Sequence, residues 1–101
     1  MAVINVADVN VWVDGEKLSI TELDENRAQQ ITAEVMGAVQ SKYSTHSWTH
    51  PTNTPLIIRR IISMRYAGYL FHTAYSPDVD PGSYGDRLLE DSQKLLDSIV
   101  N

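Results

Sequence analysis

Residues 54–77, TPLIIRRIISMRYAGYLFHTAYSP, are the most apolar stretch of this 101-residue chain. Thr54 is suited to cap a helix, and Pro55 fits the first helical position, where the missing N–H of proline costs nothing. Ser76 precedes a proline, which disfavours helical geometry and indicates where the helix ends. The stretch therefore predicts a long central helix over about residues 55–75.

Apolar residues surround most of the axis of this predicted helix. One broad face, projected at about 100° per residue, carries Ile57, Ile58, Ile61, Ile62, Met64, Gly68, Tyr69 and Phe71. Leu56, Ala67 and Leu70 lie on the other side. Three arginines exclude a membrane span, because each costs about 2.5–3.5 kcal/mol at the centre of a bilayer. Since two amphipathic helices cover only part of such a helix, we expect another copy of the chain, or another protein, to cover the rest.

Arg65 projects into the apolar face of the central helix, between Ile58 and Ile61. An unpaired buried charge costs several kcal/mol. The guanidinium must therefore reach the surface along its aliphatic stem, or pair with an acid of the first or last helix or of a neighbouring subunit. The sequence leaves both arrangements open.

A helix is predicted on each side of the central one, over about residues 21–43 and 84–100. Thr21 with Asp24, and Ser83 with Asp86, have the form of capping boxes at the two starts. The apolar stripe of the first helix is Ala28, Ile31, Val35, Ala38 and Val39, and that of the last is Leu88, Leu89, Leu95, Leu96 and Ile99. Gly37 weakens the first helix and is interpreted as a close helix–helix contact.

Residues 1–20 allow two local structures. Alternating valines before Asp14-Gly15 are typical of a β-hairpin. Asn5 is also suited to cap a short helix through Val6, Val9 and Val13. An isolated hairpin is marginal in water, so we favour the short helix.

The predicted fold is all-α: one domain over residues 1–101, a small bundle of three main helices with a short N-terminal helix or hairpin, and flexible loops at 44–54 and 76–85. The hydrophobic content of 43% is too high for a disordered chain. The absence of cysteine excludes disulfides, thiolate nucleophiles and cysteine-based zinc sites. The first residues do not have the pattern of a signal peptide, so we expect a protein made in a cytoplasm.

Charge is segregated along the chain, whose net charge is −5. Residues 1–26 and 76–101 are acidic, whereas residues 27–75 carry five basic residues and one acid. A basic middle between acidic ends favours charge pairing within the fold or between copies, although solvated helix faces give the same pattern. It argues against a domain that reads nucleic acid.

Two groups of side chains have part of the spacing of metal ligands: His46 with His50, and Asp78 with Asp80 and Asp86. The histidines fall in a polar loop with no glutamate between them, and the acids lack a further ligand and the closing glutamate of a calcium loop. No nucleophile motif or glycine-rich phosphate loop is present. We therefore expect no metal, no cofactor and no enzymatic activity.

Three segments, in this order, resemble a known family: ITELDENRAQQITAEVMGAVQSKY (20–43), TPLIIRRIISMRYAGYLF (54–71) and GDRLLEDSQKLLDSI (85–99). The order, lengths and residue types are similar to those of the head–tail connector proteins, also called adaptor or head-completion proteins, of long-tailed bacteriophages. The hairpin signal at Asp14-Gly15 departs from that family.

The resemblance implies a virion structural protein in the neck between capsid and tail, made in the host cytoplasm. It implies a ring, commonly a dodecamer, that docks beneath the portal protein, extends the DNA channel without sequence-specific binding and provides a platform for further neck or tail-completion proteins. Ile58, Ile61, Ile62, Arg65 and Tyr69 would be core or intersubunit positions. Portal or neighbour contacts would come from Trp48, Leu95, Leu96 and Ile99. The alternative is a small cellular helical protein–protein interaction module, either monomeric or dimeric.

Overall fold

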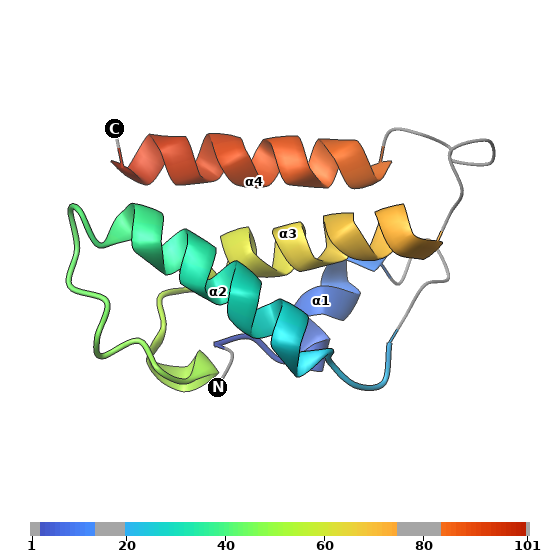
Figure 1. Cartoon of the computed structure of the whole chain (residues 1–101), viewed down its shortest axis with the longest axis horizontal. Helices are drawn as coiled ribbons and strands as arrows, with labels where there is room; N and C mark the ends of the chain where they lie inside the picture. The colour runs from blue at the N-terminus through green and yellow to red at the C-terminus, as the bar shows by residue number, and fades with distance from the viewer. Residues whose placement is uncertain (1–2, 14–19, 75–83, 101) are drawn as a thin grey trace.

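The computed structural model describes residues 3–13, 20–74 and 84–100, and over those residues the chain is helical, with no strand. The helices are α1 (Val6–Val13), α2 (Glu25–Val39), the short 3-10 helix η2 (Pro51–Asn53), α3 (Leu56–Ala74) and α4 (Tyr84–Val100) (Figure 1). The prediction of an all-α small bundle is confirmed, as is the short N-terminal helix. Asp14-Gly15, Ser83 and the acids Asp78 and Asp80 lie outside the described residues.

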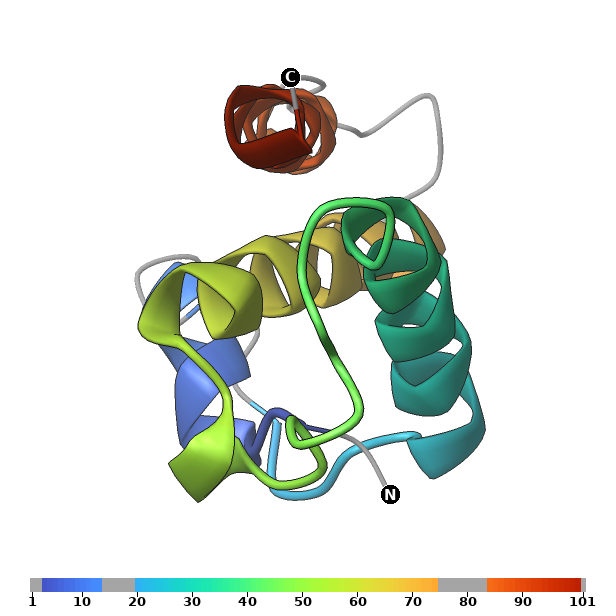
Figure 2. The ribbon, with the colours of Figure 1, turned by 90° about the vertical axis from the view of Figure 1, so that its left-hand side faces the viewer.

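Helix α3 is the centre of the bundle and contacts each of the other three α-helices. Helix α4 runs antiparallel along one side of α3, and α1 packs on another side (Figures 1 and 2). Helix α2 crosses α3 and also contacts α4. This arrangement brings the end of α2, the start of α3 and the end of α4 to one end of the molecule (Figure 1).

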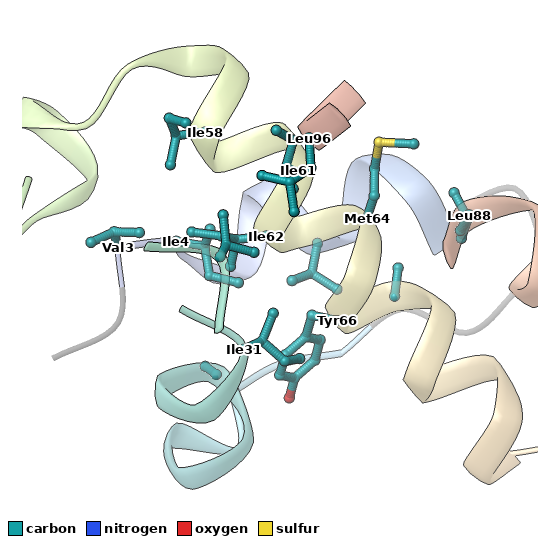
Figure 3. Close-up of a cluster of buried hydrophobic side chains, with 14 of the residues drawn as sticks. Val3, Ile4, Ile31, Ile58, Ile61, Ile62, Met64, Tyr66, Leu88 and Leu96 are labelled. Atoms are coloured by element: carbon teal, nitrogen blue, oxygen red, sulfur yellow. The ribbon is translucent and has the colours of Figure 1, made fainter. Parts of the chain in front are cut away.

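The chain itself buries the middle of α3, where every residue from Ile61 to Gly68 is buried. Side chains of the segment before α1, of α2 and of α4 meet those of α3 in one core (Figure 3). The expectation that another copy or protein is needed over this part of the helix is therefore wrong, because α1 supplies the missing cover. Exposed apolar surface remains at the start of α3, where Leu56 and Ile57 are 54% and 39% exposed.

Two glycines allow α3 and α4 to approach closely. A Cβ atom on Gly68 would lie 2.7 Å from Leu89 Cγ and 3.1 Å from the Gly85 carbonyl oxygen. A Cβ atom on Gly85 would lie 2.9 Å from Phe71 Cβ. The close contact predicted at Gly37 is wrong, since a Cβ atom there would meet open space.

Helix α2 begins four residues later than predicted and ends at Val39. Asp24, and not Thr21, is its N-cap: the Asp24 Oδ1 atom accepts from the Arg27 N–H at 3.2 Å. The Asp24 N–H donates to the buried Tyr66 hydroxyl at 2.8 Å, which ties the start of α2 to α3. Ala38, predicted for the apolar stripe, is exposed, whereas Ala28, Ile31, Val35 and Val39 are buried.

Helix α3 begins at Leu56, one residue later than predicted. The Pro55 carbonyl accepts from the Arg59 N–H at 3.1 Å and so occupies the capping position. Thr54 does not cap the helix as expected, because its hydroxyl donates backward to the His50 carbonyl at 2.7 Å. The hydroxyl therefore joins the start of α3 to the loop before it.

Polar side chains fix α1 at both ends. Asn5 and Asp8 form a reciprocal capping box: the Asp8 N–H donates to Asn5 Oδ1 at 3.0 Å, and the Asn5 N–H to Asp8 Oδ2 at 3.1 Å. Asn10 binds both the N–H and the carbonyl of Ile20, at 2.9 and 3.0 Å. The Trp12 indole N–H donates to the Ser63 hydroxyl at 3.0 Å, which joins α1 to α3.

Candidate interaction surface

An open apolar groove lies at the end of the molecule where α2 and α4 end and α3 begins. Its volume is about 260 Å³, and it is lined by Tyr43, Trp48, Pro55, Ile57, Ile58 and Ile99. Tyr43 is 48% exposed, so one wall of the groove is an aromatic ring that faces solvent. We call these six residues the apolar groove.

Backbone hydrogen bonds place the two aromatic walls of the groove. The Tyr43 N–H donates to the Val39 carbonyl at 3.1 Å, in the turn that follows α2. The Trp48 N–H donates to the Thr45 carbonyl at 2.9 Å, and the half-buried indole packs against the core. These bonds fix the backbone at both positions, and the Trp48 ring is also held by its packing against the core.

Asn53 organises the loop that carries Trp48. Its Oδ1 atom accepts from the backbone N–H groups of Thr49 and His50, at 3.1 and 2.9 Å. Together with the Thr54 bond to the His50 carbonyl, these contacts close the loop just before α3. Because backbone donors in a loop otherwise bind water, this bracing shapes the groove before any partner binds.

Two of the three guanidinium nitrogens of Arg65 have partners inside the chain, whereas its buried Nε atom has none within the described residues. Arg65 is 8% exposed, and its Nη1 atom donates to Glu34 Oε1 of α2 at 2.7 Å. Its Nη2 atom donates to Gln93 Oε1 of α4, and Gln93 Nε2 donates in turn to Asp97 Oδ1 at 2.9 Å. Of the two arrangements that the sequence left open, the structure has the ion pair, with Glu34 of α2. The charge of Arg65 therefore links α2, α3 and α4 of one chain.

The other residues singled out from the sequence fall into three groups. Ile58, Ile61 and Ile62 lie in the core of the chain, and Leu96 is also buried there. Tyr69 is half-buried, with the Arg27 guanidinium 5.8 Å from the centre of its ring. Trp48 and Ile99 line the apolar groove, whereas the half-buried Leu95 packs against the core.

Sequence reasoning missed Tyr43, Pro55 and Ile57 as surface residues. Tyr43 was expected inside the first helix, and Ile57 at the edge of the buried face of the central helix. Their exposure depends on where α2 stops and on how far α4 extends over α3. The neighbouring Trp48, an isolated large apolar residue in a polar loop, was the available signal.

No metal-ligand cluster is present in the part of the chain that the structure describes, where no three His, Asp or Glu side chains gather. His46 Nδ1 lies 3.0 Å from the Ser44 hydroxyl in the loop, and His72 Nε2 lies 2.8 Å from Asp86 Oδ1 across the start of α4. Over residues 3–13, 20–74 and 84–100, none of the helices is long and apolar enough to cross a bilayer.

Comparison of the chain with protein-family models, with curated proteins and with solved structures found no match. The functional conclusion therefore rests on the residues and their arrangement.

Proposed function

We propose that the chain is a structural adaptor in the neck of a long-tailed phage virion. It docks as a ring beneath the portal protein, extends the DNA channel and offers a platform to the next neck or tail-completion protein. The order of its helices, which resembles that of head–tail connector proteins, supports this function. Its place is the virion neck after synthesis in the host cytoplasm.

The observation that carries the proposal is the apolar groove. Exposed apolar surface that is contiguous and shaped is typical of a protein interface. Within the described residues, the exposed large apolar side chains are Val11, Tyr43, Leu56 and Ile57, and two of these four line the groove. An apolar segment of the portal protein fits this surface, and Tyr43 and Trp48 supply the aromatic anchors that protein interfaces favour.

The acidic charge of the chain is compatible with a place beside DNA. A net charge of −5 repels phosphates at long range, which lets DNA pass through a channel without sticking. A ring also needs two different complementary faces on each subunit, and acidic and basic segments alternate along the chain. These properties support a channel component through which DNA passes without sequence-specific binding.

A binding experiment with matched variants tests the proposal. The purified chain is mixed with the portal protein encoded in the same genome, and assemblies are weighed by mass photometry. We expect the chain alone to be monomeric or weakly associated, and to form a ring, a dodecamer in the simplest case, with the portal protein. Ile57→Ser should weaken this assembly about tenfold or more, because it removes an exposed apolar wall of the groove. Val11→Ser, a matched change outside the groove, should leave assembly unchanged.

Two results would overturn the proposal. One is a tight dimer of the isolated chain in which the groove is closed, which would favour the small interaction module instead. The other is assembly with the portal protein that responds to Val11→Ser and not to Ile57→Ser.

A further inference from the structure

A second surface hollow lies between α1 and the start of α3, separate from the apolar groove. Its volume is about 310 Å³, and its rim carries Val11 of α1 and Leu56 of α3. Val11 is 74% exposed, more than any other large apolar residue in the described part of the chain. Because Leu56 and Ile57 are adjacent on α3, the first turn of that helix separates the two surfaces.

Trp12 and Ser63 give this hollow a fixed lining. The Trp12 indole N–H donates to the Ser63 hydroxyl at 3.0 Å, and that hydroxyl donates to the Arg60 carbonyl at 3.2 Å. The indole is half-buried and packs against the core. The ring therefore presents a rigid apolar surface whose polar atom is already bonded.

The described residues that line the hollow carry more positive than negative charge. Arg59 and Arg60 both line it, and among these described residues Asp8 is the one acid. Asp8 Oδ1 lies 3.5 Å from Arg59 Nη1, and the buried Arg59 Nε has no hydrogen-bond partner within the described residues. Arg60 is exposed, and over the same residues it has no ion pair. Within the described residues, the Arg60 guanidinium therefore has no carboxylate partner and is available to bind an external one.

We infer that this surface binds an acidic amphipathic helix of a partner protein. The exposed aliphatic rim selects apolar side chains, and the planar guanidinium of Arg60 matches a carboxylate at the edge of the same helix. A hollow between two packed helices is the setting in which helix-in-groove recognition occurs. The inference does not rest on the adaptor function, because it concerns a different surface and a different occupant.

Nucleic acid fits this surface less well than an acidic helix. Phosphate backbones are bound by several cations in a row, whereas here a carboxylate offsets one of two arginines. The exposed Val11 and Leu56 would remain uncovered against a phosphate backbone. Charge and apolar surface together therefore favour the acidic helix.

The test uses a synthetic peptide and the full chain. The probe is a fluorescein-labelled helix of about 18 residues, with leucines at i, i+3, i+4 and i+7 spacing and glutamates on both flanks. Binding is followed by fluorescence anisotropy at low and physiological salt. Two competitors are a peptide with lysine in place of every glutamate and a DNA duplex.

We expect the acidic peptide to bind, with an affinity that falls as salt rises. Arg60→Glu should weaken binding about tenfold or more, and Arg60→Gln by less, because only the first adds repulsion. Val11→Ser should also weaken it, whereas Ile57→Ser should not. Thermal melts of each variant show that it is folded.

Three results would overturn the inference. The first is no binding of the acidic peptide to the folded chain. The second is equal binding of the lysine peptide. The third is duplex DNA binding that depends on Arg60 while the acidic peptide does not bind.

Discussion

The Arg65–Glu34 contact yields the sharpest stability prediction, because its two partners differ in burial. Arg65 is 8% exposed, whereas the Glu34 side chain is 55% exposed. Glu34→Gln leaves the buried guanidinium without its counter-charge, while the new amide is free to bind water. Arg65→Met removes the buried charge and its orphaned Nε atom, and leaves Glu34 and the exposed Gln93 in contact with solvent.

The expected changes in the free energy of unfolding follow from this difference in burial. Removing one partner of a fully buried pair costs about 3–5 kcal/mol, and exposed pairs contribute about 0.2–1 kcal/mol. With one partner buried and one half-exposed, we expect Glu34→Gln to lower the free energy of unfolding by about 1–2 kcal/mol. Arg65→Met should change it by less than about 1 kcal/mol, since the lost hydrogen bonds are offset by the removal of a buried charge.

The assay is urea unfolding followed by far-UV circular dichroism, on the two single variants and the double variant. In the Arg65→Met background, Glu34→Gln should have almost no effect, which gives a coupling free energy of about 1–2 kcal/mol. The matched control is Glu90→Gln, because Glu90 pairs at 3.5 Å with Lys94 on the exposed face of α4. That control should cost less than about 0.5 kcal/mol. Additive effects of the two substitutions, or a Glu34→Gln cost no larger than the control, would refute the reasoning.

Two further predictions concern packing and capping. Gly68→Ala should destabilise the protein by about 1–3 kcal/mol, because the new Cβ meets Leu89 and the Gly85 carbonyl. Gly37→Ala should stabilise it by up to about 1 kcal/mol, because that glycine faces open space. Thermal melts distinguish these outcomes, and equal effects of the two substitutions would contradict the account of the α3–α4 contact. Tyr66→Phe should cost about 1–2 kcal/mol, because the Asp24 N–H loses its acceptor. An unchanged urea midpoint would show that water replaces the hydroxyl.

Local sequence signals predicted the helix bounds well where proline or turn-forming residues flank a helix. The bounds of α3 and α4 follow closely from Pro55 before the one and the turn-rich segment before the other. The start of α2 was misplaced because the sequence offers two capping residues three positions apart, and the prediction used Thr21 as the N-cap instead of Asp24. The bond from the Asp24 N–H to Tyr66, which no local pattern reveals, joins the second of them to α3.

Tertiary arrangement accounts for the larger errors. The spacing of the valines in α1 fits a strand as well as a helix. The apolar surface of α3 that α1 buries was therefore left out of the sequence-based prediction, which overestimated the need for an outside partner. Gly37 and Gly68 look alike in sequence, and only the path of α4 makes the second one a contact point. Trp48 and Ile99, two of the four contact residues that the resemblance implies, line the groove. The other walls were not predicted, because they depend on where three elements end.

The central claim is that the apolar groove is a docking surface for the portal protein. Electron cryomicroscopy of the chain mixed with the portal protein tests it most directly. The account predicts a ring of the chain beneath the portal, with Tyr43, Trp48 and Ile57 buried against a portal segment. A complex in which these three side chains remain exposed, or a mixture in which the chain forms only closed dimers, would contradict it.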